Sequence, residues 1–123
     1  MKTALVTGGA KRIGAEVVRA LAEDGWRVLV HYNTSASEAE DLADSLTASG
    51  SVVQTIGCDL ANLEATLNLI QECNKLVGPL DCLINNASLF EPDWLMSVEP
   101  ALWQRQLDVN LRAPTLLTKA FAK

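Results

Sequence analysis

Met1-Lys-Thr-Ala-Leu-Val-Thr-Gly-Gly-Ala-Lys-Arg-Ile-Gly-Ala15 opens the chain and decides its fold. The apolar and β-branched run from Thr3 to Val6 predicts a buried strand, the glycines behind it predict a turn, and the apolar spacing after Arg12 predicts a helix. A glycine turn between a strand and a helix leaves the first N–H groups of the helix unpaired, with the positive end of the helix dipole behind them. We therefore expect an anion to bind at this turn.

The glycine spacing of this turn departs from the plain Gly-x-Gly-x-x-Gly pattern. Five residues separate Gly8 from Gly14, and Arg12 stands at the middle glycine position. By itself the spacing would equally suit a tight turn that binds nothing. Because the turn carries Lys11 and Arg12 and opens an alternating β/α chain, we favour a dinucleotide phosphate site. Gly8 is expected to allow the turn, and Gly14 to allow close packing of the helix on the sheet.

Strands and helices alternate along the rest of the chain. Apolar runs predict strands over 26–32, 52–56 and 80–84, and an irregular loop over 85–98. Four helices are predicted from their apolar faces and caps. Their signals are an apolar face of Ile13, Val17, Val18 and Leu21; a capping box over Ser37–Glu40; an Asn62 N-cap before Leu63, Leu67 and Ile70, with Gly78-Pro79 at the end; and Pro100, which begins a helix that runs to the last residue.

The element order β α β α β α β α predicts an α/β fold, a doubly wound parallel sheet of the Rossmann type. Residues 1–123 are expected to form a single dinucleotide-binding domain with ligands at the carboxyl ends of the strands. The full fold has two halves, and this chain has only the first half plus a fourth strand and its helix. We expect a truncated fold, the N-terminal half of a longer enzyme, with exposed apolar residues on its last helix: Leu102, Leu116, Leu117 and Phe121.

Composition limits the function classes further. The chain has 123 residues, is 49% hydrophobic and carries a net charge of −5, which predicts a globular domain without a basic face for nucleic acid. No apolar run approaches the roughly 18 residues of a membrane span, so we expect a cytoplasmic protein without a membrane partner. Cys58, Cys73 and Cys82 are odd in number and widely spaced, which favours reduced core thiols over disulfides or a metal site.

Four motifs follow one another along the chain: Thr7-Gly-Gly-Ala-Lys-Arg-Ile-Gly14, Cys58-Asp-Leu60, Asn85-Asn-Ala-Ser88 and Val109-Asn-Leu-Arg-Ala-Pro114. Together, in this order, they resemble the short-chain dehydrogenase/reductase family. Lys11-Arg12, His31-Tyr32 with Ser35-Ala36, and Ala87-Ser-Leu-Phe90 resemble the pteridine reductases within that family. The resemblance implies an NADP(H)-dependent oxidoreductase that transfers hydride to a pterin or dihydropteridine C=N bond, and a homodimer or homotetramer in the full-length form.

The resemblance also implies a set of cofactor-binding residues at the strand ends. Asp59 would accept from the adenine amino group while Leu60 packs beside the ring; the simpler alternative is that Asp59 only opens the next helix. Asn86 and Ala87 would support both cofactor and sheet. The cofactor-binding candidates are Gly8, Lys11, Arg12, Ile13, Gly14, His31, Tyr32, Asn33, Thr34, Ser35, Asp59, Leu60, Asn86, Ala87 and Ser88.

The end of the second predicted strand favours NADP(H) over NAD(H). NAD enzymes place an acid there, roughly 20 residues past the glycine turn, to hold the ribose hydroxyls. His31-Tyr-Asn-Thr-Ser35 has no acid, and its hydroxyl and amide groups, with Arg12 nearby, can donate to a 2′-phosphate. The pteridine reductases tend to have an arginine where Thr34 stands, so the phosphate clamp is expected to be weaker. His31, the only histidine, is assigned to this rim.

Arg12, Ser88 and Phe90 match the positions at which pteridine reductases hold the substrate, with the aromatic ring stacked on the pterin. Phe90 would equally suit a residue that anchors the loop or the core. A reductase of carbonyl substrates, of the 3-oxoacyl type, shares every motif except these three residues. A non-catalytic dinucleotide-binding module is the alternative outside enzymes.

Asn110 is the catalytic candidate, because it matches the asparagine of the family's catalytic helix. Pro114 stands four residues later and cannot donate to the Asn110 carbonyl, so that carbonyl can hold a water. In the family this water joins a proton relay to a lysine and the catalytic tyrosine. The family's Tyr-x-x-x-Lys pair is absent, since Tyr32 is the only tyrosine and Ala36 stands four residues after it. We expect the 123 residues alone not to turn over.

Overall fold

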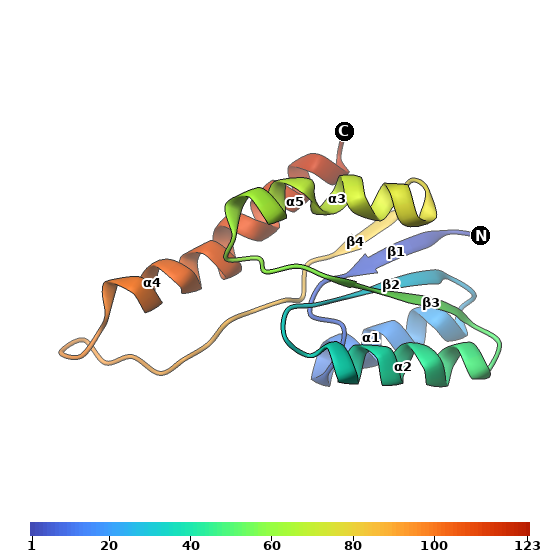
Figure 1. The fold of residues 1–123 in the computed structure, drawn as a ribbon, viewed down its shortest axis with the longest axis horizontal. Helices are drawn as coiled ribbons and strands as arrows, with labels where there is room; N and C mark the ends of the chain where they lie inside the picture. The colour runs from blue at the N-terminus through green and yellow to red at the C-terminus, as the bar shows by residue number, and fades with distance from the viewer.

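The computed structural model describes residues 1–123 and has one parallel sheet with the strand order β3-β2-β1-β4 (Figure 1). The α/β, doubly wound arrangement predicted from the sequence is confirmed. The strands are β1 (Thr3–Val6), β2 (Arg27–Tyr32), β3 (Val52–Gly57) and β4 (Cys82–Ile84). The helices are α1 (Arg12–Glu23), α2 (Ala36–Ala48), α3 (Leu63–Val77), α4 (Pro100–Leu107), the π-helical turn η1 (Asp108–Arg112) and α5 (Ala113–Phe121).

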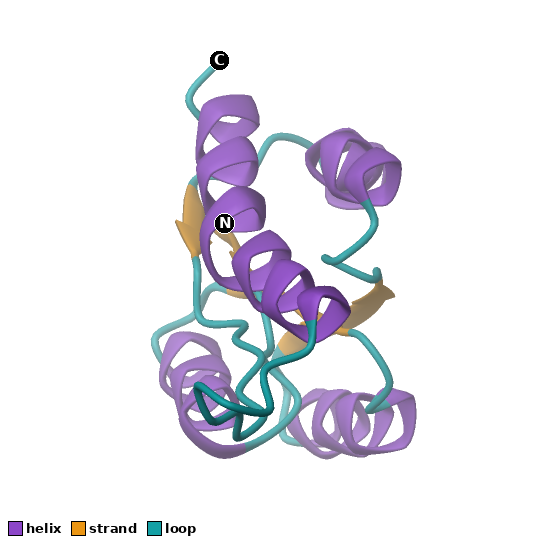
Figure 2. Ribbon diagram, turned by 90° about the vertical axis from the view of Figure 1, so that its left-hand side faces the viewer, coloured by secondary structure: helices purple, strands orange, loops and turns teal.

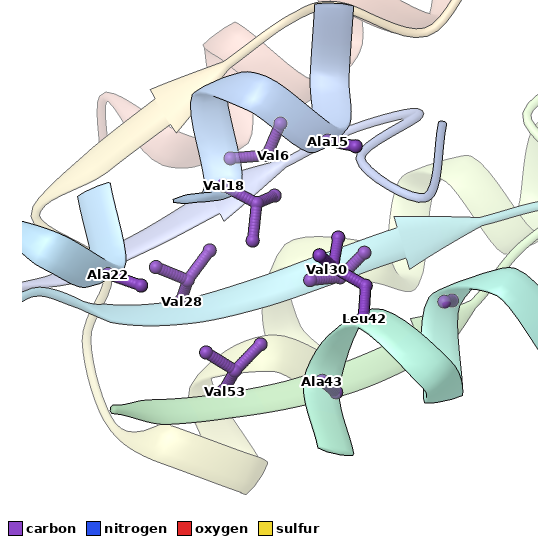
Figure 3. Packing of buried hydrophobic residues seen from close by; sticks show 10 residues of the cluster. Val6, Ala15, Val18, Ala22, Val28, Val30, Leu42, Ala43 and Val53 are labelled. Atoms are coloured by element: carbon purple, nitrogen blue, oxygen red, sulfur yellow. The ribbon is translucent and has the colours of Figure 1, made fainter. Parts of the chain in front are cut away.

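The sheet lies between two helix layers, α1 with α2 on one face and α3 with α5 on the other (Figures 1 and 2). Alternate strand residues face opposite layers, as the two-residue period of a strand requires. Leu5 and Leu29 pack toward α3 and α5, whereas Val6 and Val30 pack toward α1 and α2 (Figure 3). All four are fully buried, so β1 and β2 are covered on both faces and hold the glycine turn at a fixed place.

The apolar face predicted for α1 is partly wrong. Ile13 is 74% exposed, while Val18 is fully buried and Val17 and Leu21 are partly buried. Apart from Val18, the helix buries only small residues, Gly14, Ala15 and Ala22. The contact face is therefore rotated away from Ile13.

The face predicted for α3 is displaced in the same way. Leu63 and Leu67 are 48% and 53% exposed, whereas Ile70 is buried as predicted. The helix packs with the stripe Thr66, Leu69, Ile70 and Cys73. Thr66 can lie on a buried face because its hydroxyl donates to the carbonyls of Leu60 and Asn62, at 3.3 and 2.8 Å.

The two predicted N-terminal helix caps have different outcomes, and the predicted C-terminal cap is present. The Asn62 side chain accepts from the N–H of Ala65 at 2.9 Å, which confirms the N-cap of α3. The capping box over Ser37–Glu40 does not form, because α2 begins earlier, at Ala36 behind Ser35, and no side chain caps it. Gly78 ends α3 with a φ of +81°, a conformation that favours glycine.

The single long helix predicted from Pro100 is interrupted by η1. At the end of η1, the N–H of Ala113 donates to the carbonyl of Asp108, five residues back, where an α-helix would bond four residues back. Insertion of such a wider turn is one way in which a helix accommodates a proline, here Pro114. The prediction of exposed apolar residues on this helix is wrong for Leu117, which is 1% exposed, and Phe121 also packs against the core.

Leu102 and Leu116 are partly buried. The apolar residues that are exposed in this region are different ones. These are Phe90, Trp94, Leu95, Met96 and Val98 in the loop and Trp103, Leu107 and Leu111 on α4 and η1. The three cysteines are free, Cys73 buried and the other two half-buried. No helix has the length and apolar character needed to cross a membrane.

Candidate functional site

The glycine turn between β1 and α1 brings backbone against backbone. Gly8 has a φ of +61°, and a Cβ there would lie 2.9 Å from the Cα of Ala87. A Cβ on Gly14 would overlap the Gly8 carbonyl oxygen and lie 2.6 Å from Nδ2 of Asn86. Both glycines occupy positions that a side chain cannot, which agrees with the structural roles expected for them. The turn is thus an open backbone cradle of the kind that fits a pyrophosphate.

Arg12 has an unusual backbone conformation at the mouth of this turn. Its φ is +53°, and it is the only non-glycine residue of the chain with a positive φ. Such a left-handed conformation costs a non-glycine residue about 1 to 2 kcal/mol. The strain falls at the position where the plain fingerprint has its middle glycine, so an exposed guanidinium is retained there at a cost in stability.

Two side chains tie the turn to the end of β4. The Thr7 hydroxyl accepts from the N–H groups of Asn86 and Ala87, both at 3.0 Å, and donates to the Ile84 carbonyl at 3.4 Å. Asn86 Nδ2 donates to the carbonyls of Thr7 and Gly8, both at 3.1 Å. The Asn86 side chain therefore binds the main-chain carbonyls of the turn and does not project into the groove as a free donor on Nδ2. Thr7, 1% exposed, was not among the predicted site residues, although it begins the glycine motif.

His31 ties the same turn to the other neighbouring strand. The N–H of Gly8 donates to its Nδ1 at 3.0 Å, so Nε2 carries the proton and donates to the Cys58 carbonyl at 2.8 Å. The ring is 1% exposed, and this burial lowers the pKa of His31, while the hydrogen bond to Cys58 opposes the shift. Both ring nitrogens are occupied, so His31 is a brace beneath the rim and is not free to donate to a phosphate.

A first cavity of about 300 Å³ opens beside the turn. Its wall combines the glycine turn, the residues after β2 and β3, the loop after β4, and α4. Eleven predicted site residues line it: Gly8, Lys11, His31, Tyr32, Asn33, Thr34, Ser35, Asp59, Leu60, Ala87 and Ser88. Four further lining residues were not predicted: Ala10, Leu89, Arg105 and Val109.

A second cavity of about 430 Å³ lies on the other side of the turn. It shares Gly8, Lys11, Ala87 and Ser88 with the first, so the two form one groove across the cradle. Its other lining residues are Arg12, Ile13, Gly14 and Asn86. Arg12 lines only this second cavity, so it does not share a cavity with Asn33–Ser35 as expected; Lys11 is the cation of the turn that does.

Asp59 makes a hydrogen bond in the turn that leads into α3, and it also lines the first cavity. Its Oδ1 accepts from the N–H of Ala61 at 2.9 Å, which shapes the turn into the Asn62 cap. No protein group donates to its second carboxylate oxygen, which leaves an acceptor at the cavity wall. Leu60, the next residue, is 4% exposed and is anchored in the core beside α3.

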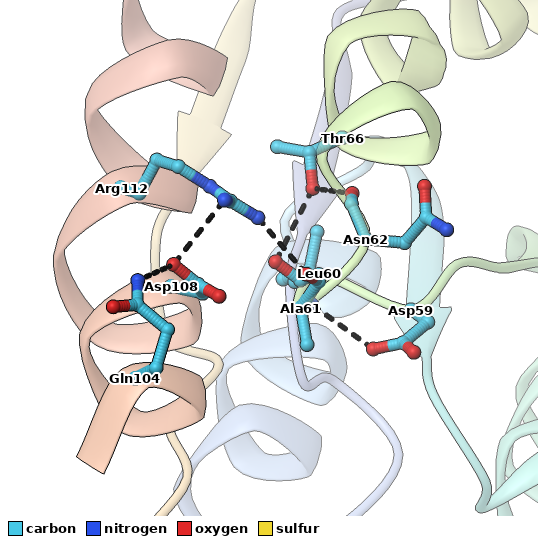
Figure 4. A network of polar contacts seen from close by, with 8 residues as sticks. All are labelled: Asp59, Leu60, Ala61, Asn62, Thr66, Gln104, Asp108 and Arg112. Atoms are coloured by element: carbon cyan, nitrogen blue, oxygen red, sulfur yellow. Dashed lines mark hydrogen bonds and ion pairs between the residues drawn. The ribbon is translucent and has the colours of Figure 1, made fainter. Parts of the chain in front are cut away.

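A polar network holds this Asp59–Leu60 segment against η1 (Figure 4). Arg112 donates to the Ala61 carbonyl at 2.9 Å and pairs with Asp108 at 3.2 Å. Gln104 donates to the same Asp108 oxygen at 2.8 Å. The network fixes the position of the segment after β3, which carries Leu60, against η1, which carries Val109; both residues line the cavity. Gln104, Asp108 and Arg112 stand four residues apart along the chain, but the bond to Ala61 joins them to a segment 51 residues away, which no local sequence pattern indicated.

The Asn110 side chain binds the loop after β4. Its Oδ1 accepts from the N–H of Leu89, and its Nδ2 donates to the carbonyl of the same residue, both at 2.8 Å. This reciprocal pair places Ser88 and Leu89 beside the groove. Phe90, the next residue, is 81% exposed and lines neither cavity, so the structure does not bring it together with Arg12 and Ser88.

A doubly wound parallel sheet, an open glycine cradle and a groove across the strand ends are the features of the Rossmann class, in which dinucleotides bind at the carboxyl ends of the strands. The short chain dehydrogenase model matches residues 2–123. The chain belongs to the short-chain dehydrogenase family.

Known proteins similar to this chain agree with that assignment. FolM alternative dihydrofolate reductase 1 from Brucella canis, solved with NADP, is 36% identical, has a TM-score of 0.89 and is matched over 98% of this chain and 48% of its own. A short chain dehydrogenase from Burkholderia cenocepacia with NADP is 35% identical, with a TM-score of 0.93 over 98% of this chain and 49% of its own. The 3-oxoacyl-[acyl-carrier-protein] reductase FabG of Staphylococcus aureus is 33% identical over 111 residues, 90% of this chain and 45% of the relative. The chain thus spans about half the length of the proteins it matches.

Proposed function

We propose that this chain is the N-terminal half of the domain of an NADP(H)-dependent reductase that acts on a pterin or dihydropteridine C=N bond. The observation that carries the cofactor assignment is the cavity wall after β2. Asn33, Thr34 and Ser35 there are neutral donors without a carboxylate, and Lys11 lines the same cavity. A 2′-phosphate would be accepted at such a wall, whereas an acid would repel it.

The residues of the groove fit the parts of NADP(H). The open turn around Gly8 and the cations Lys11 and Arg12 suit the pyrophosphate. The unused oxygen of Asp59 suits the adenine amino group, and Leu60 with Val109 offers apolar walls for the ring. When bound, the cofactor supplies hydride chemistry, while the chain's own residues bind and orient it.

The substrate assignment rests on Arg12 and Ser88, which share the second cavity, and on the similarity to the Brucella FolM reductase. Strain at Arg12 supports it, because a left-handed non-glycine residue is maintained where a function requires its side chain. Phe90 contributes less support, since its ring lies outside the groove in this structure.

Asn110 is proposed to take part in proton transfer through its main-chain carbonyl. Pro114 cannot donate to that carbonyl, and η1 surrounds it with a widened helical turn. A water held there would connect to the tyrosine and lysine that the family uses, which lie outside these 123 residues. The 123 residues alone are therefore proposed to bind nucleotide without turnover.

The test is NADPH oxidation by the intact protein with a dihydropteridine and, in parallel, with a 3-oxoacyl thioester. We expect turnover with the dihydropteridine and a preference for NADPH over NADH. Turnover with the thioester alone would replace the pterin substrate by a carbonyl substrate of the 3-oxoacyl type. The 33% identity to FabG supports this second candidate. Nucleotide binding without any turnover would favour a non-catalytic dinucleotide-binding module.

We further propose a cytoplasmic homodimer or homotetramer with a small-molecule substrate and no nucleic-acid or membrane partner. The exposed Trp103, Leu107 and Leu111 on α4 and η1 support association through this side of the molecule. The three free cysteines support a reducing compartment. Light scattering of the intact protein at several concentrations tests the oligomeric state.

A further inference from the structure

The ten lysines and arginines of the chain differ in whether the structure gives their side chains a partner. Those with an acidic side chain, a carbonyl or an aromatic ring as partner are Lys2, Arg19, Arg27, Lys75 and Arg112. Those without one are Lys119 and Lys123 at the end of the chain, and Lys11, Arg12 and Arg105 on the groove. In a chain with a net charge of −5, most of the unpaired cations are therefore gathered at one groove.

Of the three unpaired cations on the groove, Arg105 is the one that belongs neither to the glycine motif nor to the residues after β2. It lies in α4, one helical turn before Val109, and both residues line the first cavity. The same cavity is lined by Thr34 and Ser35 after β2. The Arg105 side chain is exposed and makes no ion pair with Asp59, the acid of this cavity, so its guanidinium is available to a ligand.

The charge balance of the first cavity favours a phosphate as that ligand. The residues after β2 supply only neutral donors, and Lys11 is shared with the second cavity, where the pyrophosphate is proposed to lie. A phosphate monoester carries nearly two negative charges at neutral pH. A guanidinium can donate two parallel hydrogen bonds to such a group, which a lysine cannot. The adenine ring is neutral and needs no second cation.

We propose that Arg105 is a specificity-determining residue that binds the adenosine 2′-phosphate from the α4 side of the cavity, together with Lys11. It supplies a cation that the residues after β2, among them Thr34, do not supply. The inference rests on the proposed NADP(H) site and adds a residue from a different element to it. The selection of NADP(H) is thereby shared between the glycine turn and α4.

The test is calorimetric titration of the intact protein with 2′,5′-ADP and with ADP at one fixed salt concentration. Arg105→Gln should weaken binding of 2′,5′-ADP about tenfold or more, and leave ADP within about twofold. Arg105→Lys should recover part of the loss, and adding Thr34→Arg to Arg105→Gln should recover more. Lys119→Gln, which removes one charge from an exposed site away from the groove, is the matched control and should bind both probes as the wild type does.

Each other outcome has a definite meaning. An equal loss for both probes would place Arg105 on the adenine or the shared 5′-phosphates and overturn the proposal. An unchanged preference for 2′,5′-ADP in Arg105→Gln would also overturn it. A wild-type protein that does not prefer 2′,5′-ADP over ADP would overturn the NADP(H) assignment itself, which separates failure of the proposed function from failure of the Arg105 role.

Discussion

The backbone N–H of Gly8 donates to Nδ1 of His31 at 3.0 Å, which makes a buried imidazole part of the glycine turn. The acceptor role of Nδ1 leaves the proton on Nε2, which donates to the Cys58 carbonyl. The turn, β2 and the end of β3 are thereby joined through one neutral side chain. Protonation of His31 would put a second N–H against the Gly8 N–H and break this joint.

Acidification should therefore destabilise the protein through His31. Burial lowers the pKa of His31 in the folded state, whereas in the unfolded state this pKa is about 6.5. As the pH falls through that value, the unfolded state binds more protons than the folded state, so the free energy of unfolding decreases. Urea unfolding between pH 7.5 and 5 measures the fall. His31→Gln keeps an acceptor and a donor but does not titrate, so its stability should depend less on pH over this window. Identical pH dependence of the two proteins would contradict the prediction.

Gly14→Ala should destabilise the protein by about 2 to 3 kcal/mol, because the added methyl group overlaps backbone that cannot move away. Gly50→Ala is the matched control. Gly50 has a φ of +98° and open space around it, so only the conformational cost of about 1 kcal/mol applies there. Denaturant midpoints of the two variants compare the effects, and equal losses would show that close packing at Gly14 is unimportant.

Arg12 offers a comparison in which glycine should be more stabilising than alanine. Within a helix, Gly is normally less stable than Ala by about 0.5 to 1 kcal/mol. At Arg12 the φ of +53° reverses this order, so Arg12→Gly should be more stable than Arg12→Ala by about 1 kcal/mol. Both variants lose the same cation and should weaken NADPH binding similarly, about tenfold. Thermal unfolding and NADPH titration together separate the backbone effect from the charge effect.

Asn110→Leu should free the loop after β4 from η1. Both hydrogen bonds to Leu89 are lost, at a cost of about 1 kcal/mol since the site is open to water. Hydrogen exchange at the Leu89 amide should become faster. Asn85→Leu removes the neighbouring Asn85–Thr118 bond of 3.0 Å and should leave that amide protected. If both variants expose Leu89 equally, the reciprocal pair is not what holds the loop.

The sequence indicated the alternating strands and helices of a doubly wound parallel sheet and the glycine turn, because these depend on local apolar runs and on Gly8 and Gly14. It misplaced Ile13 and Leu67, which are apolar yet exposed, because a helix face is decided by how closely the helix approaches the sheet. Small residues on α1 carry that information but have a weak apolar signal.

The site was predictable where it is built from consecutive residues, as after β2 and β3. It was not predictable where partners come from distant segments. Arg105 and Val109 line the cavity only because α4 follows the loop back to the strand ends, and the role of His31 depends on a buried contact with Gly8. Arg12 and Thr34 were placed together in the sequence interpretation, but the turn separates them into different cavities.

The ties from Thr7, Asn86 and His31 to the glycine turn end on main-chain groups. Such ties depend on the path of the backbone, so they place no demand on the identity of the side chains that face the groove. Thr34 and Arg105 are exposed and have no bond to the cradle, and they can be exchanged without disturbing it. The structure thus separates a frame built on main-chain contacts from the exposed side chains of the groove wall, so substitutions at Thr34 or Arg105 alter the wall and leave the frame intact.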